Sequence, residues 1–111
     1  MSVVLSESVL IELQEILGED YQLFLQTFCE DTTNRLAKMH AALVNNDVSI
    51  LKQESHSLKG SSSNLGAHCL FNACHDLEEY SKREDLAQLG DLVDAVQFQA
   101  NQVIGLLHKT G

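Results

Sequence analysis

One histidine of this sequence lies at helical spacing from residues that could modify its chemistry. His56 has Lys52 four residues before it and Lys59 three residues after it, with Gln53 and Gly60 at the neighbouring positions. Residues three and four apart share a face of an α-helix, so these groups would surround the imidazole. An imidazole can act as a base, a nucleophile or a metal ligand near neutral pH. The segment presents an imidazole beside an ammonium group, an amide and a gap, and it is the first candidate for a functional site.

The leucines of the same segment predict which way His56 points. Leu51, Leu58 and Leu65 share one direction on a helix of about 100° per residue, and His56 lies about 200° from Leu58. We therefore expect the imidazole to point outward. Gly60 lies off the leucine seam, although a glycine inside a helix costs about 1 kcal/mol relative to alanine. Its role is either close packing of another helix or clearance for a partner that approaches His56.

Helical periodicity extends along the whole chain and predicts the elements that hold this face. The sequence contains no proline, and it shows no strand-like alternation, internal repeat or low-complexity segment. We expect an all-α fold, an up-down antiparallel four-helix bundle with a short extra N-terminal helix, forming a single domain over residues 1–111. The predicted helices are Glu7–Leu17, Asp20–Asn45, Val48–Leu65, Ala67–Lys82, and a last helix from Asp85 or Asp91 to His108.

Caps and apolar seams refine this prediction. Ser6 and Asp47 are expected to cap the first and third helices, and Gly18 and Gly66 to end them. The side chains expected to point inward are spaced by threes and fours. They are Val9, Leu10, Leu13, Ile16 and Leu17; Phe24, Leu25, Phe28, Thr32, Leu36, Met39 and Leu43; Leu51, Ser55, Leu58, Ser62 and Leu65; Leu70, Ala73, Cys74, Leu77 and Tyr80; and Leu86, Leu89, Leu92, Val93, Val96, Ile104 and Leu107.

The composition excludes several classes of function. The 16 acidic residues against 7 lysines and arginines give a formal net charge of −9, whereas nucleic-acid binding needs a basic footprint. No apolar run approaches the roughly 20 residues of a membrane span. The segment from Met1 to Glu7 lacks the basic and apolar regions of a secretory signal. Three cysteines without a C-x-x-C pair fit reduced thiols, so we expect a cytoplasmic protein.

Residues 55–67, Ser-His-Ser-Leu-Lys-Gly-Ser-Ser-Ser-Asn-Leu-Gly-Ala, resemble a known motif. The motif belongs to histidine-containing phosphotransfer (HPt) domains, and it consists of His, any residue, Leu, Lys, Gly and a Gly-Ala pair about six residues on. The predicted bundle agrees with this family over essentially the whole chain. Ser55 stands where the family usually has alanine, and a small residue there still suits close packing. The sequence is thus similar to a free-standing HPt domain.

The resemblance implies a phosphorelay and assigns a role to each residue of the candidate site. His56 would accept a phosphoryl group from a receiver-domain aspartate and pass it to, or return it from, a response regulator. Lys59 would offset the phosphoryl charge, and Gln53 would hydrogen-bond a phosphoryl oxygen. Gly60 would give the receiver clearance. Mg²⁺ would be held by the receiver's carboxylates, so no cofactor or metal is expected in this chain.

The partners implied are receiver domains of a hybrid sensor kinase, of a response regulator, or of both. They would dock on a partly apolar patch of the second and third helices near the histidine. The chain lacks a Walker-type loop and a glycine-rich ATP loop, so no ATP-dependent kinase activity is expected. A four-helix bundle that buries its own seams needs no second subunit, which favours a monomer.

The distribution of acidic residues fits a phosphoryl acceptor. Acidic residues gather in 1–34 and in 76–94, whereas Glu54 is the only one between Val48 and His75. A phosphoryl group carries roughly two negative charges near pH 7, and nearby carboxylates would oppose its arrival. We therefore expect the face around His56 to be free of acidic side chains.

Two other functions remain open from the sequence. A non-catalytic helical adaptor would use the same bundle to bind a partner protein, with His56 incidental. A metal site is the weaker of the two alternatives, because Cys69 and Cys74 lie five residues apart rather than at the usual C-x₂₋₄-C spacing. The other members of that cluster would be His68, His75 and Glu79. The remaining histidines, His40 and His108, are expected on the surface or near a helix end.

Overall fold

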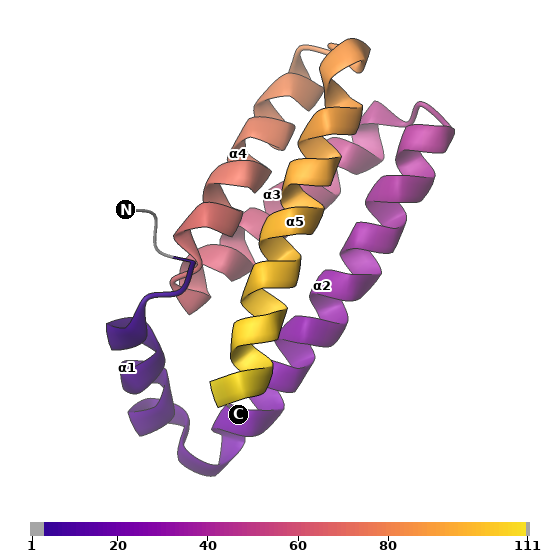
Figure 1. The fold of residues 1–111 in the computed structure, drawn as a ribbon. Helices are drawn as coiled ribbons and strands as arrows, with labels where there is room; N and C mark the ends of the chain where they lie inside the picture. The colour runs from indigo at the N-terminus through magenta and orange to yellow at the C-terminus, as the bar shows by residue number, and fades with distance from the viewer. Residues whose placement is uncertain (1–3, 111) are drawn as a thin grey trace.

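Four long helices run alternately up and down, and a short helix lies beside the end where the first of them begins (Figure 1). The computed structural model describes residues 4–110, and none of these residues forms a strand. The all-α prediction, an up-down antiparallel four-helix bundle with a short N-terminal helix, is confirmed. The helices are α1 (Glu7–Leu17), α2 (Tyr21–Val44), α3 (Val48–Leu65), α4 (His68–Lys82) and α5 (Leu86–Thr110), with a 3₁₀ turn, η1 (Gly18–Asp20), between α1 and α2.

The predicted helix bounds agree closely with these elements. The first and third helices have the predicted ends, the second is one residue shorter at each end, and the fourth begins one residue later than predicted. The last helix begins one residue after Asp85 and continues beyond His108. Residues 1–3 and 111 lie outside the described residues, so part of the prediction for Met1 to Glu7 falls there. The single domain over residues 1–111 stays a prediction.

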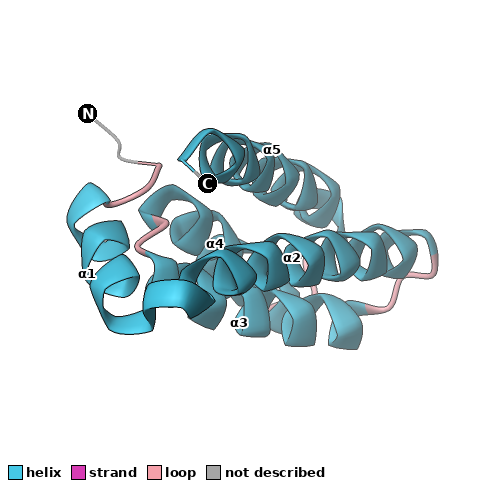
Figure 2. Ribbon diagram, turned by 90° about the horizontal axis from the view of Figure 1, so that it is seen from below, coloured by secondary structure: helices cyan, strands magenta, loops and turns pink. Residues whose placement is uncertain are grey.

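Neighbouring helices in the chain are neighbours in space. Helix α3 packs against α2 and α4, and α5 packs against α4 and α2, so the four form a closed ring around one core. Figure 2 shows this arrangement from the end at which α1 lies. Because α3 is flanked by α2 on one side and α4 on the other, a side chain of α3 can meet either helix.

The turn between α3 and α4 depends on Gly66. Gly66 adopts φ +74°, the left-handed conformation that favours glycine. The amide of Ala67 donates to the Ser62 carbonyl at 2.9 Å. The Gly66 carbonyl accepts from the Ser6 amide at 3.0 Å. A Cβ at this position would lie 2.9 Å from the Cβ of Ser6. Gly66 therefore ends α3 and also holds the residue that precedes α1 in close contact.

The capping predictions are confirmed for three of four residues. The carboxylate of Asp47 accepts from the Ile50 amide at 3.2 Å, and Gly18 follows the last residue of α1. Ser6 precedes α1, but its hydroxyl meets the Ser8 hydroxyl at 3.1 Å and caps no backbone amide. Ser6 therefore occupies the predicted N-cap position of α1, but its hydroxyl does not make the predicted capping hydrogen bond.

The core follows the predicted seams, with two clear exceptions. Ile16 is 77% exposed, because α1 touches the bundle through one narrow face, and Leu86 is 54% exposed at the first residue of α5. The inward prediction is wrong for both. Several predicted residues are only half-buried: Val9, Leu10, Leu13, Leu17, Phe24, Leu43, Ala73, Tyr80, Leu92 and Ile104. Buried residues that the seams missed are Tyr21, Ala42, Glu54, Ala67, Glu78, Ser81, Ala100 and Val103.

The seam of α3 contains buried serines whose hydroxyl groups bond within the helix. Ser55 donates to the Leu51 carbonyl at 2.7 Å, and Ser62 donates to the Leu58 carbonyl at 2.7 Å. A buried hydroxyl that is hydrogen-bonded in this way avoids the cost of desolvation. Small serines therefore let the neighbouring helices pack closely against α3.

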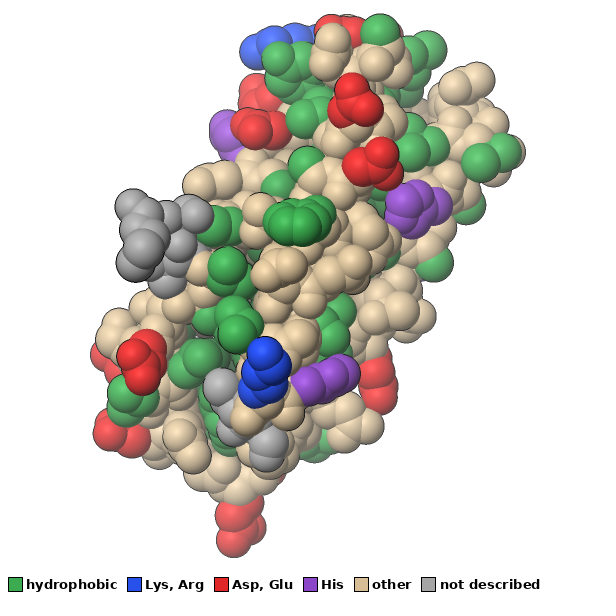
Figure 3. Space-filling model, in the orientation of Figure 1, with side chains coloured by type: hydrophobic (Ala, Val, Ile, Leu, Met, Phe, Trp, Pro, Cys, Tyr) green, Lys and Arg blue, Asp and Glu red, His purple; other side chains and the backbone are tan. Residues whose placement is uncertain are grey.

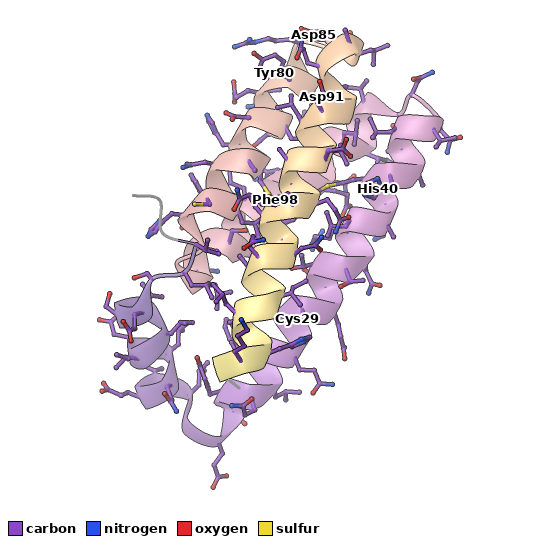
Figure 4. All side chains as sticks on the ribbon, viewed as in Figure 1. Cys29, His40, Tyr80, Asp85, Asp91 and Phe98 are labelled. Atoms are coloured by element: carbon purple, nitrogen blue, oxygen red, sulfur yellow. The ribbon has the colours of Figure 1, made fainter. Side chains whose placement is uncertain are left out.

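The face formed by α5 and α2 mixes hydrophobic and polar side chains (Figure 3). Figure 3 shows acidic side chains over the upper part of this face, and Figure 4 labels Asp85 and Asp91 there. Lower down, His40 of α2 meets Gln97 of α5 with 3.0 Å between Nε2 and Oε1. All the histidines outside the motif are exposed, as predicted. Helix α3 lies behind α5 in this view, so this acidic surface is distinct from the α3 surface described next.

Candidate functional site

The imidazole of His56 projects from α3 at the seam with α4. Its side chain is 69% exposed, as the leucine seam predicts. Leu58, two residues on, is fully buried and fixes the orientation of this part of α3. The ring is held by one contact, because His56 Nδ1 lies 2.9 Å from Glu78 Oε2 on α4. The imidazole is thus open to solvent on one side and anchored to the neighbouring helix on the other.

Glu78 is the residue at this site that sequence reasoning missed. Its side chain is 6% exposed, and its other oxygen, Oε1, lies 2.6 Å from Lys59 Nζ. Lys82, one turn along α4, lies 3.8 Å from Oε2. Burial alone would raise the pKa of this carboxyl, but the hydrogen bonds and charges of Lys59 and His56 lower it below 4.5. Glu78 is therefore ionised near neutral pH and bridges both motif residues.

This arrangement corrects the expectation that the face of His56 is free of acidic side chains. Glu78 belongs to the acidic segment 76–94, yet the packing of α4 on α3 brings it into direct contact with the histidine. Counting charges along the chain cannot detect a contact between two helices. The available signal was its position on the inward stripe of α4, four residues after the buried Cys74. A carboxylate on such a stripe needs a partner.

Lys59 lies on the same face as His56, as predicted. Its side chain is 21% exposed, and its ammonium group is paired with Glu78 of α4, a contact that the sequence did not indicate. The carboxylate thus links the two side chains, and the pair and the imidazole form one charged cluster.

A shallow hollow of about 350 Å³ lies over this cluster. Gln53 is exposed and lines it together with His56, so the structure brings the predicted amide to the site. The remaining lining residues are Lys52, Ser57, Glu78 and Lys82. Three cationic or amide groups therefore border the space in front of the imidazole, which suits an anionic group.

Gly60 lies on the exposed surface of α3, one turn from His56. A Cβ at this position would meet no atom within 4 Å. Close packing of another helix of this chain, one of the two roles considered for Gly60, is therefore not seen. The other role, clearance for a partner, fits the open surface.

The metal alternative receives no support from the structure. Cys74 is fully buried, and burial raises the pKa of its thiol to about 12, whereas His68 and His75 are exposed. Among residues 4–110, no three histidine, cysteine or acidic side chains converge on a point that could hold a metal ion. Within the same residues, no helix is both long and apolar enough to cross a membrane.

Comparison with known proteins places this geometry in context. A family model described as the Hpt domain matches residues 23–108. The crystal structure of histidine-containing phosphotransfer protein B (HptB) from Pseudomonas aeruginosa PAO1 is similar, with 34% sequence identity and a TM-score of 0.94. That match covers 99% of this chain and 96% of that chain. The comparison with curated proteins gave no match.

Proposed function

Because this chain belongs to the Hpt domain family, whose role is phosphotransfer in two-component signalling, we propose that His56 is its phosphoacceptor. In this proposal the chain is a phosphorelay intermediate. It takes a phosphoryl group from a receiver-domain aspartate and passes it to, or returns it from, a response regulator. The observation that carries the proposal is the 69% exposed imidazole, anchored on one side, in a motif with Lys59 and Gly60.

The transfer step needs few groups from this chain. A ring nitrogen of His56 attacks the phosphorus of the aspartyl phosphate, an N–P bond forms, the P–O bond breaks, and the aspartate leaves as a carboxylate. Positioning and charge neutralisation supply most of the catalysis in such transfers. Lys59 and Gln53 would offset or hydrogen-bond the phosphoryl oxygens from this chain. Mg²⁺ would be bound by the carboxylates of the receiver.

A receiver domain would approach over the exposed surface of α3 and the adjoining face of α2. A groove of about 200 Å³ between these helices is lined by Phe24, Phe28 and the acidic Asp31 of α2 and by Ser61, one residue after Gly60. This groove supports our proposal of a partly apolar contact patch for the receiver. The open surface at Gly60 supports its role in clearance. A monomer in the cytoplasm remains our expectation for the working protein.

Incubation with phosphorylated receiver domains tests the proposal. Each receiver of the source organism is charged with radiolabelled acetyl phosphate and mixed with this chain. We expect at least one receiver to give a label on the chain that is labile to acid and stable to base, as a phosphohistidine is. The matched control is His56→Gln. Equal behaviour of the wild type and this variant would overturn the relay and favour an adaptor that binds its partner without accepting phosphate.

A further inference from the structure

We propose that the outward face of α5 binds the same face of a second copy of this chain, with the two helices antiparallel. This inference does not depend on the proposed function of His56. Helix α5 packs against α2 and α4 and lies diagonally across the core from α3 (Figure 2). The outward face of α5 therefore points away from the surface that carries His56, and a contact there leaves the candidate site of each copy open.

Helix α5 carries two seams with the spacing of a coiled coil. One seam is buried in the core of the bundle and consists of Leu89, Val93, Val96, Ala100, Val103 and Leu107. The other seam begins two residues later, about 200° around the helix, and all its members are exposed. They are Asp91, Ala95, Phe98, Gln102, Gly105 and Lys109. Alternate steps of four and three residues keep each seam on one side of the helix, as they do where two helices form a coiled coil.

The middle of this exposed seam contains an aromatic residue and small residues. Phe98 is 59% exposed and lies at the centre of α5, where Figure 4 labels it, and Leu106 beside the seam is 37% exposed. Gly105 lies inside the helix, and among the described residues a Cβ there would meet no atom within 4 Å. Glycine destabilises the interior of a helix relative to alanine, and no packing within the described chain offsets that loss. Close approach of a second helix accounts for both features.

The charges at the two ends of the seam determine how a second copy would lie. Asp91 is near the N-terminal end of α5 and Lys109 is near its C-terminal end. In an antiparallel pair each Asp91 lies opposite Lys109 of the other copy, whereas a parallel pair would place like charges together. Opposite charges at such positions fix the orientation of paired helices. The seam is therefore complementary to itself in one orientation, which identifies a second copy as its occupant.

The same antiparallel alignment matches the sizes of the side chains between these ends. Ala95 lies opposite Gly105 of the other copy, so the two backbones can approach closely. Phe98 lies opposite Gln102, and its ring would cover the methylene groups of that side chain. A two-fold axis repeats each of these pairs, as is usual where a protein binds its own copy.

The contact should be weak. One helix from each copy buries less than the roughly 1,200 Å² of a typical stable interface. The formal net charge of −9 on each chain adds repulsion, which salt at about 0.15 M screens beyond about 8 Å. We therefore expect a dissociation constant between about 10 µM and 1 mM, with the single chain as the main form in dilute solution.

Sedimentation equilibrium of the full chain tests the association over this range of concentration. In about 0.15 M salt the mean mass should rise from that of one chain toward that of two. Phe98→Glu should weaken the association at least about tenfold, because it places two carboxylates at the centre of the contact. The matched control is Ile16→Glu, which adds the same charge at a 77% exposed apolar position of α1 and should stay within about twofold of the wild type. A constant mass up to about 1 mM, or equal association of the two variants, would overturn the proposal.

A charge swap tests the antiparallel alignment. Asp91→Lys should weaken the association about tenfold, because two ion pairs become two contacts between lysines. The double variant Asp91→Lys with Lys109→Asp restores both pairs at the original net charge and should return to within about twofold of the wild type. The control Glu12→Lys makes the same change in net charge on α1, so it should leave the association equal or slightly stronger. A double variant as weak as the single one would overturn the antiparallel pairing.

Two-dimensional NMR of the wild type locates the contact without any substitution. The amide signals of the exposed α5 seam should shift as the concentration rises, and those of the residues around His56 should stay constant. Shifts confined to another face of the bundle would overturn the proposal, even if every variant lost its fold.

Discussion

One carboxylate is buried at each of the two interfaces that α3 makes, Glu54 of α3 toward α2 and Glu78 of α4 toward α3, and their partners differ. Glu54 faces α2, where its Oε1 lies 2.9 Å from a guanidinium nitrogen of Arg35. Glu78 reaches α3 from α4 and meets His56 and Lys59. The two side chains are buried to a similar degree, 8% and 6% exposed. Burial of an acidic residue is thus used twice in this bundle, at two different interfaces.

The difference lies in what the partner can do. Arg35 is also bound by Asp31 at 2.9 Å, and a guanidinium stays protonated at any physiological pH. Such a cluster joins α2 to α3 and offers no nucleophile. His56 is exposed and has a nitrogen that can be left unprotonated. A buried carboxylate therefore indicates a reactive site only when its partner is both open to solvent and chemically versatile.

Of the substitutions that compare the two clusters, removal of the histidine should have the largest effect, a loss of phosphoryl labelling. His56→Gln should reduce labelling by a phosphorylated receiver at least about 1,000-fold, because the nucleophile itself is lost. The exposed side chain contributes little packing, so urea unfolding should give the same stability as the wild type. Arg35→Gln, on the other side of α3, should keep its labelling. Loss of labelling in both variants would erase the distinction between the two clusters.

Removing the arginine tests the structural cluster. Arg35→Met should lower the free energy of unfolding by about 2 kcal/mol, because Glu54 then stays buried without its cationic partner. Urea unfolding measures the loss, and phosphorylation of His56 by phosphoramidate, a small phosphoryl donor that needs no docking surface, should proceed at the wild-type rate. The control is Lys38→Met, which removes an exposed cation from the same helix. Similar destabilisation by both substitutions would show that the pair with Glu54 is not the cause.

Gly60 and Gly105 form a matched pair for the docking surface. Both are exposed glycines within helices, and a Cβ at either would meet no atom within 4 Å. Substitution by glutamine should therefore stabilise each helix by up to about 1 kcal/mol. Only Gly60→Gln should slow transfer from a phosphorylated receiver, by about tenfold, through displacement of the docked partner.

The phosphoramidate rate of Gly60→Gln should stay unchanged, since this donor needs no docking. Circular dichroism checks the helix content of both glycine variants. A loss of helix in Gly60→Gln would instead assign the glycine to packing, and slow transfer in Gly105→Gln would remove its link to the site.

The smallest expected effect is on the acid dependence of stability. The pKa of Glu78 is lower in the folded protein than its ordinary value of 4.5, so the unfolded chain binds more protons between the two values. The stabilisation from this carboxylate is complete above about pH 4.5 and is lost as pH falls through the folded pKa. Urea unfolding from pH 6 to pH 3 should therefore show a weaker pH dependence for Glu78→Gln than for the wild type. An unchanged profile would contradict the lowered pKa.

The sequence predicted the fold well because its signals are local. The third helix was placed with both of its ends, since Asp47 and Gly66 mark them directly. The outward orientation of His56 followed from Leu58, two residues away. Ile16 was misplaced because the short helix α1 has few neighbours to bury its stripe. Structural features that depend on residues close together in the chain could therefore be predicted from the sequence.

The missing part of the site depends on how two helices pack. Glu78 is 22 residues from His56, and the contact exists only because α4 is aligned against α3 in one register. The same alignment pairs Lys59 with Glu78, and the sequence alone did not indicate that ion pair. Periodicity predicts which face of a helix is buried, but it does not specify which residue lies opposite on the next helix. The charged contacts around His56 therefore could not be predicted from the sequence.

The contact between the beginning of α1 and Gly66 affects how easily α1 can detach from the bundle. Helix α1 has no fully buried residue, and its beginning is fixed by the bond from the Ser6 amide to the Gly66 carbonyl. Few buried contacts mean a small free energy of local opening. The amide hydrogens of α1 should therefore exchange with solvent while those of α3 stay protected. The chain can release its first helix and keep the four helices around His56 in place.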